Sequence, residues 1–248
     1  MRPILAFFTF VGESSIIFGD AVKRAPKRPV EWKETIVQMA FVGVASVPIV
    51  ALTAFFSGAV LSLYLTVFLK QYGAQSFVGA TVGLTATREI GPVIAGIMIS
   101  ARAGSAMAAQ IATMAVTEQI DALRMLGVHP TNYLVIPRML AGILMAPILA
   151  LVSIWMAVIG GMLVADSEGL SMQAFLQSVQ QYVTPMDVVK GIAKGPFFGL
   201  IVALVACQQG LRTKNGAVGV GRATTNAVVI SMVLVYIANF LLARIMYQ

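Results

Sequence analysis

An arginine and a glutamate, Arg88 and Glu89, stand side by side inside a segment that is otherwise largely apolar. A guanidinium group can hold a phosphate through paired hydrogen bonds, and a neighbouring carboxylate could tune or gate that contact. Charges at membrane depth are costly, so the pair either lines a path for a polar headgroup or is satisfied by neighbouring helices. Because adjacent helical residues point in different directions, we do not expect the two side chains to bridge each other.

A second charged element follows, where residues 117–127 read TEQIDALRMLG. Thr117 could cap a short helix over 118–126, Arg124 suits its last turn, and Gly127 suits its end. This pattern predicts a charged helix at the membrane face. It is either a coupling helix that docks into a cytosolic motor or an ordinary amphipathic connector.

Motifs for enzyme chemistry are missing from the sequence. There is no Walker A motif, catalytic triad, metal-ligand cluster or carboxylate pair, and the glycines at 216–221 lack the Lys-Ser/Thr ending of a phosphate loop. His129 lies before a proline in an expected loop, and Cys207 is alone in an apolar run. We therefore expect no catalytic residue, no metal and no cofactor in this chain.

Composition identifies the elements that must position these charges. The 248 residues are 58% hydrophobic and 11% charged, whereas soluble domains carry about 25% charged residues. The expected fold is therefore an all-α, polytopic membrane protein. Five spans are expected, at 35–69, 77–114, 139–165, 196–207 extended backwards past Lys190 and Lys194, and 223–243. A short surface helix is expected within 167–182.

Two spans should be irregular. The uncharged run 35–69 would measure roughly 52 Å as a straight helix, against about 30 Å of hydrocarbon. A tilted, bent or partly re-entrant helix is therefore expected, with Gly43, Pro48 and Gly58 as candidate bend points. Pro92 should kink the second span beside the charged pair. Small residues four apart should form a packing stripe on that span: Gly96, Ser100, Gly104 and Ala108.

The basic residues predict the topology. The chain carries a net charge of +7, but its cations lie between apolar runs, which indicates membrane orientation rather than nucleic-acid binding. With the N-terminus inside, 12 of the 17 Lys and Arg residues fall on the cytoplasmic side. The helix at 117–127 and an expected Gly-rich basic loop at 208–222 would then be cytoplasmic, and the C-terminus periplasmic. Residues 1–34 are expected to form an interfacial amphipathic segment anchored by Lys23 to Lys33, with a disordered leader as the alternative.

Several motifs in this order resemble the MlaE/YrbE permease family, the membrane subunits of ABC transporters that work with MCE-domain proteins. They are TREIGPV at 87–93, ARAGSAMAAQIATM at 101–114, TEQIDALRMLGVHP at 117–130, IPR at 136–138 and GRATTNAVV at 221–229. The resemblance covers 35–248, which we treat as one permease domain. His129 departs from the family, where an Asp is common.

The resemblance implies a homodimer in the bacterial inner membrane with a cytosolic ATPase dimer that binds ATP and Mg. It also implies a periplasmic MCE-domain assembly, often hexameric, and in some members a STAS-domain protein. The cargo would be phospholipid or a similar lipid, moved to maintain outer-membrane asymmetry. Lipid contact would fall to Arg88, Glu89, Leu61, Phe68, Leu69 and Tyr72. ATPase coupling would fall to Glu118, Ile120, Asp121, Leu123, Arg124 and Met125. A self-contained secondary transporter or channel, and a non-transporting scaffold, are the alternatives from other classes.

Overall fold

The computed structural model describes residues 2–24 and 31–247, and every regular element in these ranges is helical. Five stretches are long and apolar enough to cross a membrane, which confirms the all-α polytopic fold. They are Trp32–Lys70, Gln75–Val116, Thr131–Ser167, Pro185–Leu211 and Gly216–Tyr247. The expected basic anchors Lys27 and Arg28 lie outside the described residues.

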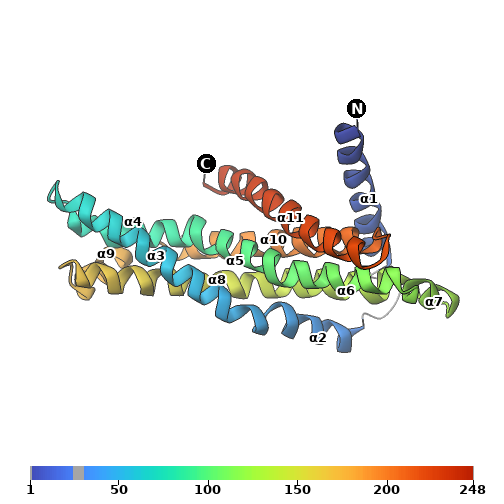
Figure 1. Ribbon diagram of the computed structural model, residues 1–248. Coiled ribbons are helices and arrows are strands. Elements are labelled where there is room, and N and C mark those ends of the chain that lie inside the picture. The colour runs from blue at the N-terminus through green and yellow to red at the C-terminus, as the bar shows by residue number, and fades with distance from the viewer. Residues whose placement is uncertain (1, 25–30, 248) are drawn as a thin grey trace.

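Most of the spans run side by side along one long axis (Figure 1). The first consists of α2 (Trp32–Val42), a 3-10 turn η1 (Val44–Ser46) and α3 (Val47–Lys70). The second consists of η2 (Gln75–Phe77), α4 (Val78–Thr85), η3 (Ala86–Ile90), α5 (Gly91–Ile99), η4 (Ser100–Gly104) and α6 (Ser105–Val116). The others are η5 (Thr131–Val135) with α8 (Ile136–Ser167), then α10 (Pro185–Leu211) and α11 (Gly216–Tyr247). Of these turns, η2 is 3-10, whereas η3, η4 and η5 are π-helical.

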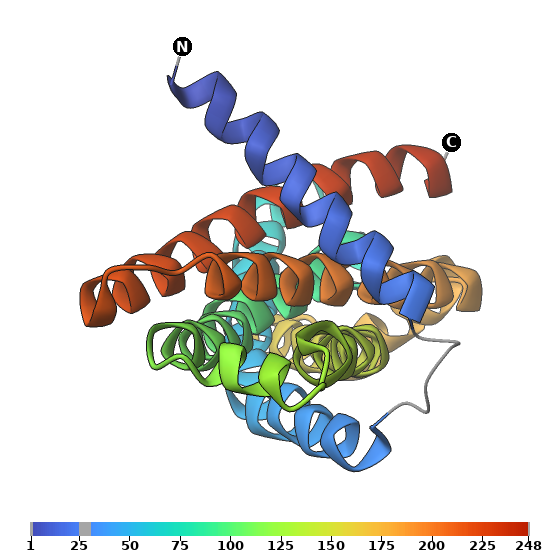
Figure 2. The same cartoon turned by 90° about the vertical axis from the view of Figure 1, so that its right-hand side faces the viewer.

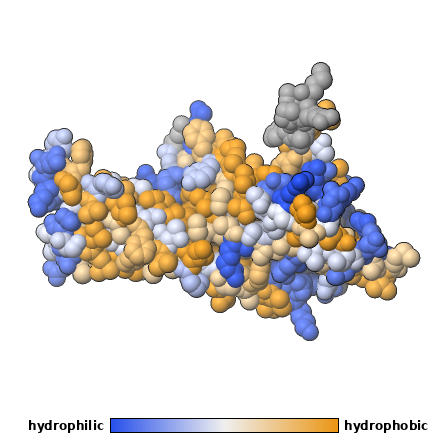
Figure 3. Space-filling model, in the orientation of Figure 1, coloured by the Kyte–Doolittle hydropathy of each residue, from blue (hydrophilic) through white to orange (hydrophobic). Residues whose placement is uncertain are grey.

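Three further helices lie outside the spans. The predicted charged helix is α7 (Gln119–Met125), at one end of the bundle, and the predicted surface helix is α9 (Met172–Tyr182), at the other. The N-terminal helix α1 (Arg2–Arg24) crosses over α10 and α11 near the α7 end (Figure 2). Hydrophilic residues gather at the two ends of the bundle, and apolar residues cover much of the surface between them (Figure 3).

The first span is broken where the sequence predicted. Helix α2 ends at Gly43, and Pro48 occupies the first turn of α3. Arg102 lies against this break, where its Nη1 donates to the Phe41 carbonyl at 2.9 Å and to the Ser46 hydroxyl at 3.3 Å. The guanidinium thus satisfies a carbonyl at a helix end. Gly58 does not break α3, contrary to expectation.

Small residues bring the spans close together. Gly58 lets α3 approach the backbone of Ala157 on α8, where an added Cβ would overlap the carbonyl. The predicted stripe is a packing surface against α10 and α11: Gly96 faces Phe198 and Val235, and Gly104 faces Val202. Ser100 and Ala108 are fully buried. Such close backbone approach is how helices associate without a hydrophobic driving force.

The prediction of a loop at 208–222 is wrong, because most of this segment is helical. Helix α10 continues to Leu211 and α11 begins at Gly216. Asn215 and Gly216 adopt φ values of 69° and 61°, and this left-handed pair reverses the chain. The remaining glycines are compatible with a membrane helix, where glycine is common.

Candidate functional site

Arg88 and Glu89 lie on the π-helical turn η3, and each contacts α10 rather than the other. The Arg88 guanidinium pairs with Asp187 Oδ1 through Nε at 2.9 Å and Nη2 at 2.8 Å. Glu89 Oε1 pairs with Lys194 Nζ at 3.0 Å. The expectation that the two neighbours do not bridge is confirmed.

Pro92 leaves one backbone carbonyl of this turn without its usual donor, and a lysine supplies the missing hydrogen bond. Proline has no N–H and cannot bond the carbonyl four residues earlier, which is that of Arg88. Lys194 Nζ donates to this carbonyl at 2.6 Å, and also to Asn239 Oδ1 at 2.9 Å. With Glu89 as third acceptor, all three ammonium protons have partners. The lysine is completely buried.

Helix α10 is shaped to present this face. Thr184 and Asp187 form a capping box at its start, so the Arg88 partner is held rigidly. Gly191, one turn further along the same face, meets the carbonyl of Thr87, where an added Cβ would overlap it. The glycine therefore lets α10 approach η3 closely enough for Lys194 to reach its acceptors.

Helix α11 closes the cluster from a third side. Asn239 Nδ2 donates to Glu89 Oε2 at 2.6 Å, so both oxygens of that carboxylate accept a hydrogen bond. The ring of Tyr247 lies 5.0 Å from the Arg88 guanidinium, 5.2 Å from Lys190 Nζ and 5.3 Å from Lys194 Nζ. Cation–π attraction thus links the three cations to the end of α11. Residues from η3, α10 and α11 together form what we call the polar cluster: Arg88, Glu89, Asp187, Lys190, Lys194, Asn239 and Tyr247.

Exposure divides the cluster into fixed and accessible parts. The side chains of Asp187 and Lys194 are 7% and 0% exposed, whereas those of Arg88 and Glu89 are each 41% exposed. The buried partners hold the charges in place, and the outer sides stay open to a polar group. The arrangement can present a guanidinium to a phosphate at membrane depth.

The predicted apolar lining lies elsewhere in a single chain. Leu61 and Leu69 pack with residues of α4, α8 and α9. Phe68 on α3 and Tyr72 in the turn after it are exposed, with ring centroids 5.2 Å apart. The structure therefore forms the polar cluster without these four residues, and their role in lipid contact stays a prediction.

Helix α7 forms as predicted, with one correction at its start. The Thr117 hydroxyl bonds back to the Thr113 carbonyl at 2.8 Å, so it closes α6 and does not cap α7. Glu118 takes the left-handed φ of 60° that starts the new helix. At the other end, Gly127 has φ +74° and Val128 N–H bonds the Leu123 carbonyl at 2.9 Å, the predicted glycine stop.

The residues of α7 divide into an anchor and a free surface. Ile120 is buried in the chain's own core with Ile111 and Leu134. Asp121 and Arg124 form an exposed pair at 2.8 Å. Leu123 is half-buried, and Glu118 and Met125 are exposed, with Met125 at 89%. Beside them lies a cleft of about 810 Å³ between α7, α1 and the turn that joins α10 to α11.

Helix α1 borders this cleft through polar contacts. Asp20 Oδ2 accepts from the Thr131 hydroxyl at 2.6 Å and lies 3.8 Å from His129 Nδ1. Burial alone would raise the pKa of Asp20, but hydrogen bonds from Thr131 and Arg24 outweigh it and hold the pKa below 3.8. His129 lies in the expected loop, and Cys207 is buried in the core.

Sequence reasoning missed the partners of the charged pair. The fourth span was expected to extend back past Lys190 and Lys194, and both lie within α10, but the pairing of Lys194 with Glu89 was not predicted. Asp187, Gly191 and Lys194 recur at helical spacing in a run that is otherwise mostly apolar, and this spacing was the available signal. Nothing in the spacing of Asn239, one of two asparagines in the last span, indicates its partners.

Five apolar spans, charges held by ion pairs within two of them and an exposed charged helix between spans two and three are the features of a multi-pass membrane protein. The family model "Permease MlaE" matches residues 35–245. A probable ABC transporter permease protein of Rickettsia conorii is 42% identical over 248 residues, covering 100% of this chain and 96% of that protein. A probable ABC transporter permease protein of Synechocystis is 42% identical over 217 residues, covering 87% of this chain and 82% of that protein. The chloroplastic protein TRIGALACTOSYLDIACYLGLYCEROL 1 of Arabidopsis thaliana is 35% identical over 234 residues, covering 94% and 67%.

The chain belongs to the MlaE permease family and is an ABC transporter permease. This membership confirms the predicted resemblance. It also decides against the self-contained transporter or channel and against the scaffold.

Proposed function

We propose that this permease moves phospholipid or a similar diacyl lipid between the inner membrane and a periplasmic MCE-domain assembly, and so maintains outer-membrane lipid asymmetry. One observation carries the lipid assignment: Arg88 and Glu89 are 41% exposed while their buried partners hold them within the second apolar span. A lipid needs a few fixed polar groups for its head and apolar surface for its tails. The Arabidopsis relative carries the name of a galactolipid, which supports a diacyl cargo.

The ATPase would dock at α7. We assign this end of the bundle to the cytosol because most Lys and Arg residues of the chain belong to it. The exposed part of α7, with Asp121, Arg124 and Met125, would enter the ATPase, and Ile120 would anchor the helix to the permease. ATP and Mg would bind to that separate subunit.

A second copy of the chain would complete the transporter. The first and last spans are the least covered by their own chain, with 28% and 11% of their most apolar windows buried. Large apolar side chains such as Tyr64 and Phe240 are exposed on them. A homodimer would cover part of this surface and could bring Leu61, Phe68, Leu69 and Tyr72 near the polar cluster. The MCE assembly would lie at the opposite, periplasmic end, and a STAS-domain protein is a further cytosolic partner.

The test combines assembly with lipid analysis. Permease with Asp121→Ala and Arg124→Ala should lose the ATPase on purification or uncouple hydrolysis from transport. Lys70→Ala with Asp166→Ala, two exposed charges in the last turns of α3 and α8 at the other end, is the matched control. Arg88→Gln should reduce the phospholipid that mass spectrometry detects on the purified complex. Normal assembly and coupling in the α7 variant would refute the docking assignment, and unchanged lipid in Arg88→Gln would refute the cargo site.

A further inference from the structure

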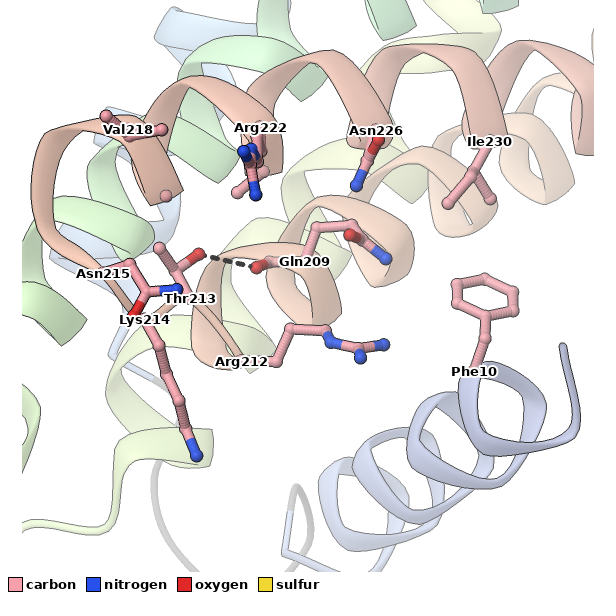
Figure 4. A pocket seen from close by; sticks show the side chains of 12 residues that line it. Phe10, Gln209, Arg212, Thr213, Lys214, Asn215, Val218, Arg222, Asn226 and Ile230 are labelled. Atoms are coloured by element: carbon pink, nitrogen blue, oxygen red, sulfur yellow. Dashed lines mark hydrogen bonds between the residues drawn. The ribbon is translucent and has the colours of Figure 1, made fainter. Parts of the chain in front are cut away.

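A basic cavity lies between α1 and the turn that joins α10 to α11, far from the polar cluster. Its volume is about 510 Å³, within the usual range for ligand sites. Its lining includes Arg212, Lys214 and Arg222 and, among the described residues, no carboxylate. Figure 4 shows Arg222 and Asn226 of α11 pointing into the cavity and Arg212 reaching in from the end of α10, while Lys214 points away.

The two arginines differ in how far they are already satisfied. Arg212 Nη1 lies 3.5 Å from Glu13 Oε2 on α1, and Gln208 also donates to that carboxylate. Arg222 is exposed and has no ion-pair partner among the described residues. The cavity therefore keeps a net positive charge that suits an anion with several acceptor oxygens.

An apolar groove continues from the basic cavity. It has a volume of about 260 Å³, is lined by Ile201, Leu204 and Val205 of α10 and by Leu234 of α11, and shares Phe10 with the basic cavity. Figure 4 places Phe10 on α1, across the cavity from Ile230. The walls thus change from cationic to apolar along one path.

One face of α11 follows this path at four-residue spacing. Its side chains run from a cation through an amide to two aliphatic groups: Arg222, Asn226, Ile230 and Leu234. The helical rise places Leu234 about 18 Å beyond Arg222 along the axis. One leaflet contributes about 15 Å of hydrocarbon. This length matches a lipid with its head at Arg222 and a chain along the groove.

We propose that this cavity and groove bind one anionic phospholipid of the leaflet on the α7 side. Its phosphate lies between Arg222 and Arg212, Asn226 contacts the ester region, and an acyl chain lies along Ile230 and Leu234. A free phosphate offers the same acceptor oxygens as the lipid headgroup but has no acyl chain to fill the groove. The bound lipid fastens α1 to α10 and α11. The site is separate from the cargo path, and its occupancy does not depend on transport.

The test measures lipid retention on the full chain purified from nanodiscs. Native mass spectrometry counts phosphatidylglycerol or phosphatidylcholine on the wild type, Arg222→Gln and Arg222→Lys. Arg244→Gln, near the other end of α11, is the charge-matched control. Phosphatidylglycerol should bind the wild type in preference to phosphatidylcholine. Arg222→Gln should weaken retention about tenfold, as expected for one lost charge-assisted hydrogen bond, whereas Arg222→Lys and Arg244→Gln should retain it.

Further arms separate the possible ligands. Leu234→Trp fills the groove with all charges kept and should also lower phosphatidylglycerol retention. It keeps the test decisive if an arginine variant fails to fold. Equal retention by Arg222→Gln and Arg244→Gln would overturn the proposal. So would displacement by soluble glycerol phosphate, which would mark a free phosphate site, or displacement by the bound ATPase subunit, which would mark a protein-docking site.

Discussion

Replacement of Glu89 by glutamine and removal of its lysine partner should each destabilise the permease, and the two effects should not add. Glu89 accepts from Lys194 at 3.0 Å through one oxygen and from Asn239 at 2.6 Å through the other. Glutamine has the same shape but one acceptor oxygen, so its amide must place a donor against one of these donors. It also leaves the buried ammonium without a counter-ion.

The magnitude follows from which charge is left behind. Loss of one partner of a buried ion pair costs about 3–5 kcal/mol. Lys194 keeps two neutral acceptors, so Glu89→Gln should fall near the lower limit, about 3 kcal/mol. Lys194→Met leaves a carboxylate that is 41% exposed and can recruit water, but it also removes the donor of the Arg88 carbonyl and of Asn239 Oδ1. We expect a cost of about 2–4 kcal/mol for these two acceptors. At roughly 2–4 °C per kcal/mol, both melting points should fall measurably below that of the wild type.

Thermal unfolding in one detergent, followed by tryptophan fluorescence, measures both variants. Asp166→Asn, an exposed carboxylate-to-amide change, is the control and should melt with the wild type. The double variant should be little less stable than Lys194→Met, because it removes the ammonium that Glu89→Gln leaves unpaired. An unchanged melting point in either single variant, or full additivity in the double variant, would refute this reasoning.

Three further predictions concern the contacts that hold the helices. Gly191→Val should clash with the Thr87 carbonyl and lower stability by about 1–3 kcal/mol in the same melt; an unchanged melt would contradict the close approach. Arg102→Met should leave the Phe41 carbonyl without its donor, so hydrogen exchange over 41–47 should accelerate, and unaltered exchange would argue against that contact. Because the pKa of Asp20 lies below its ordinary 3.8, its contribution to α1 docking is present above that value and lost as pH falls through the lowered pKa. Proteolysis of α1 should therefore stay constant from neutral pH to about 5 and rise only below 3.8 in the wild type, whereas Asp20→Asn should lack this acid-dependent rise.

The sequence predicts features that depend on one segment, and it misses those that depend on two. Pro48 and Gly43 locate the break in the first span, and Gly127 locates the end of α7, because each acts through its own backbone. The partners of Arg88 and Glu89 lie 99 and 105 residues further along the chain. Their identity depends on how close α10 can approach, which Gly191 sets. The prediction of a loop at 208–222 fails because it depends on the glycines of that segment alone and takes no account of the helices packed against it.

The second span is also not the uniform stiff rod that its small-residue stripe suggests. It contains two π-helical turns, η3 and η4. Each π-helical turn winds more residues than an α-helical one and so changes the helical register. A cation is tied to a carbonyl at each turn: Lys194 reaches from α10 to η3, and Arg102 reaches from η4 to the first span. A displacement of α7 would therefore reach the polar cluster through these two junctions. Lys194 and Arg102 are then as important for transmitting a displacement of α7 as the glycines of the second span.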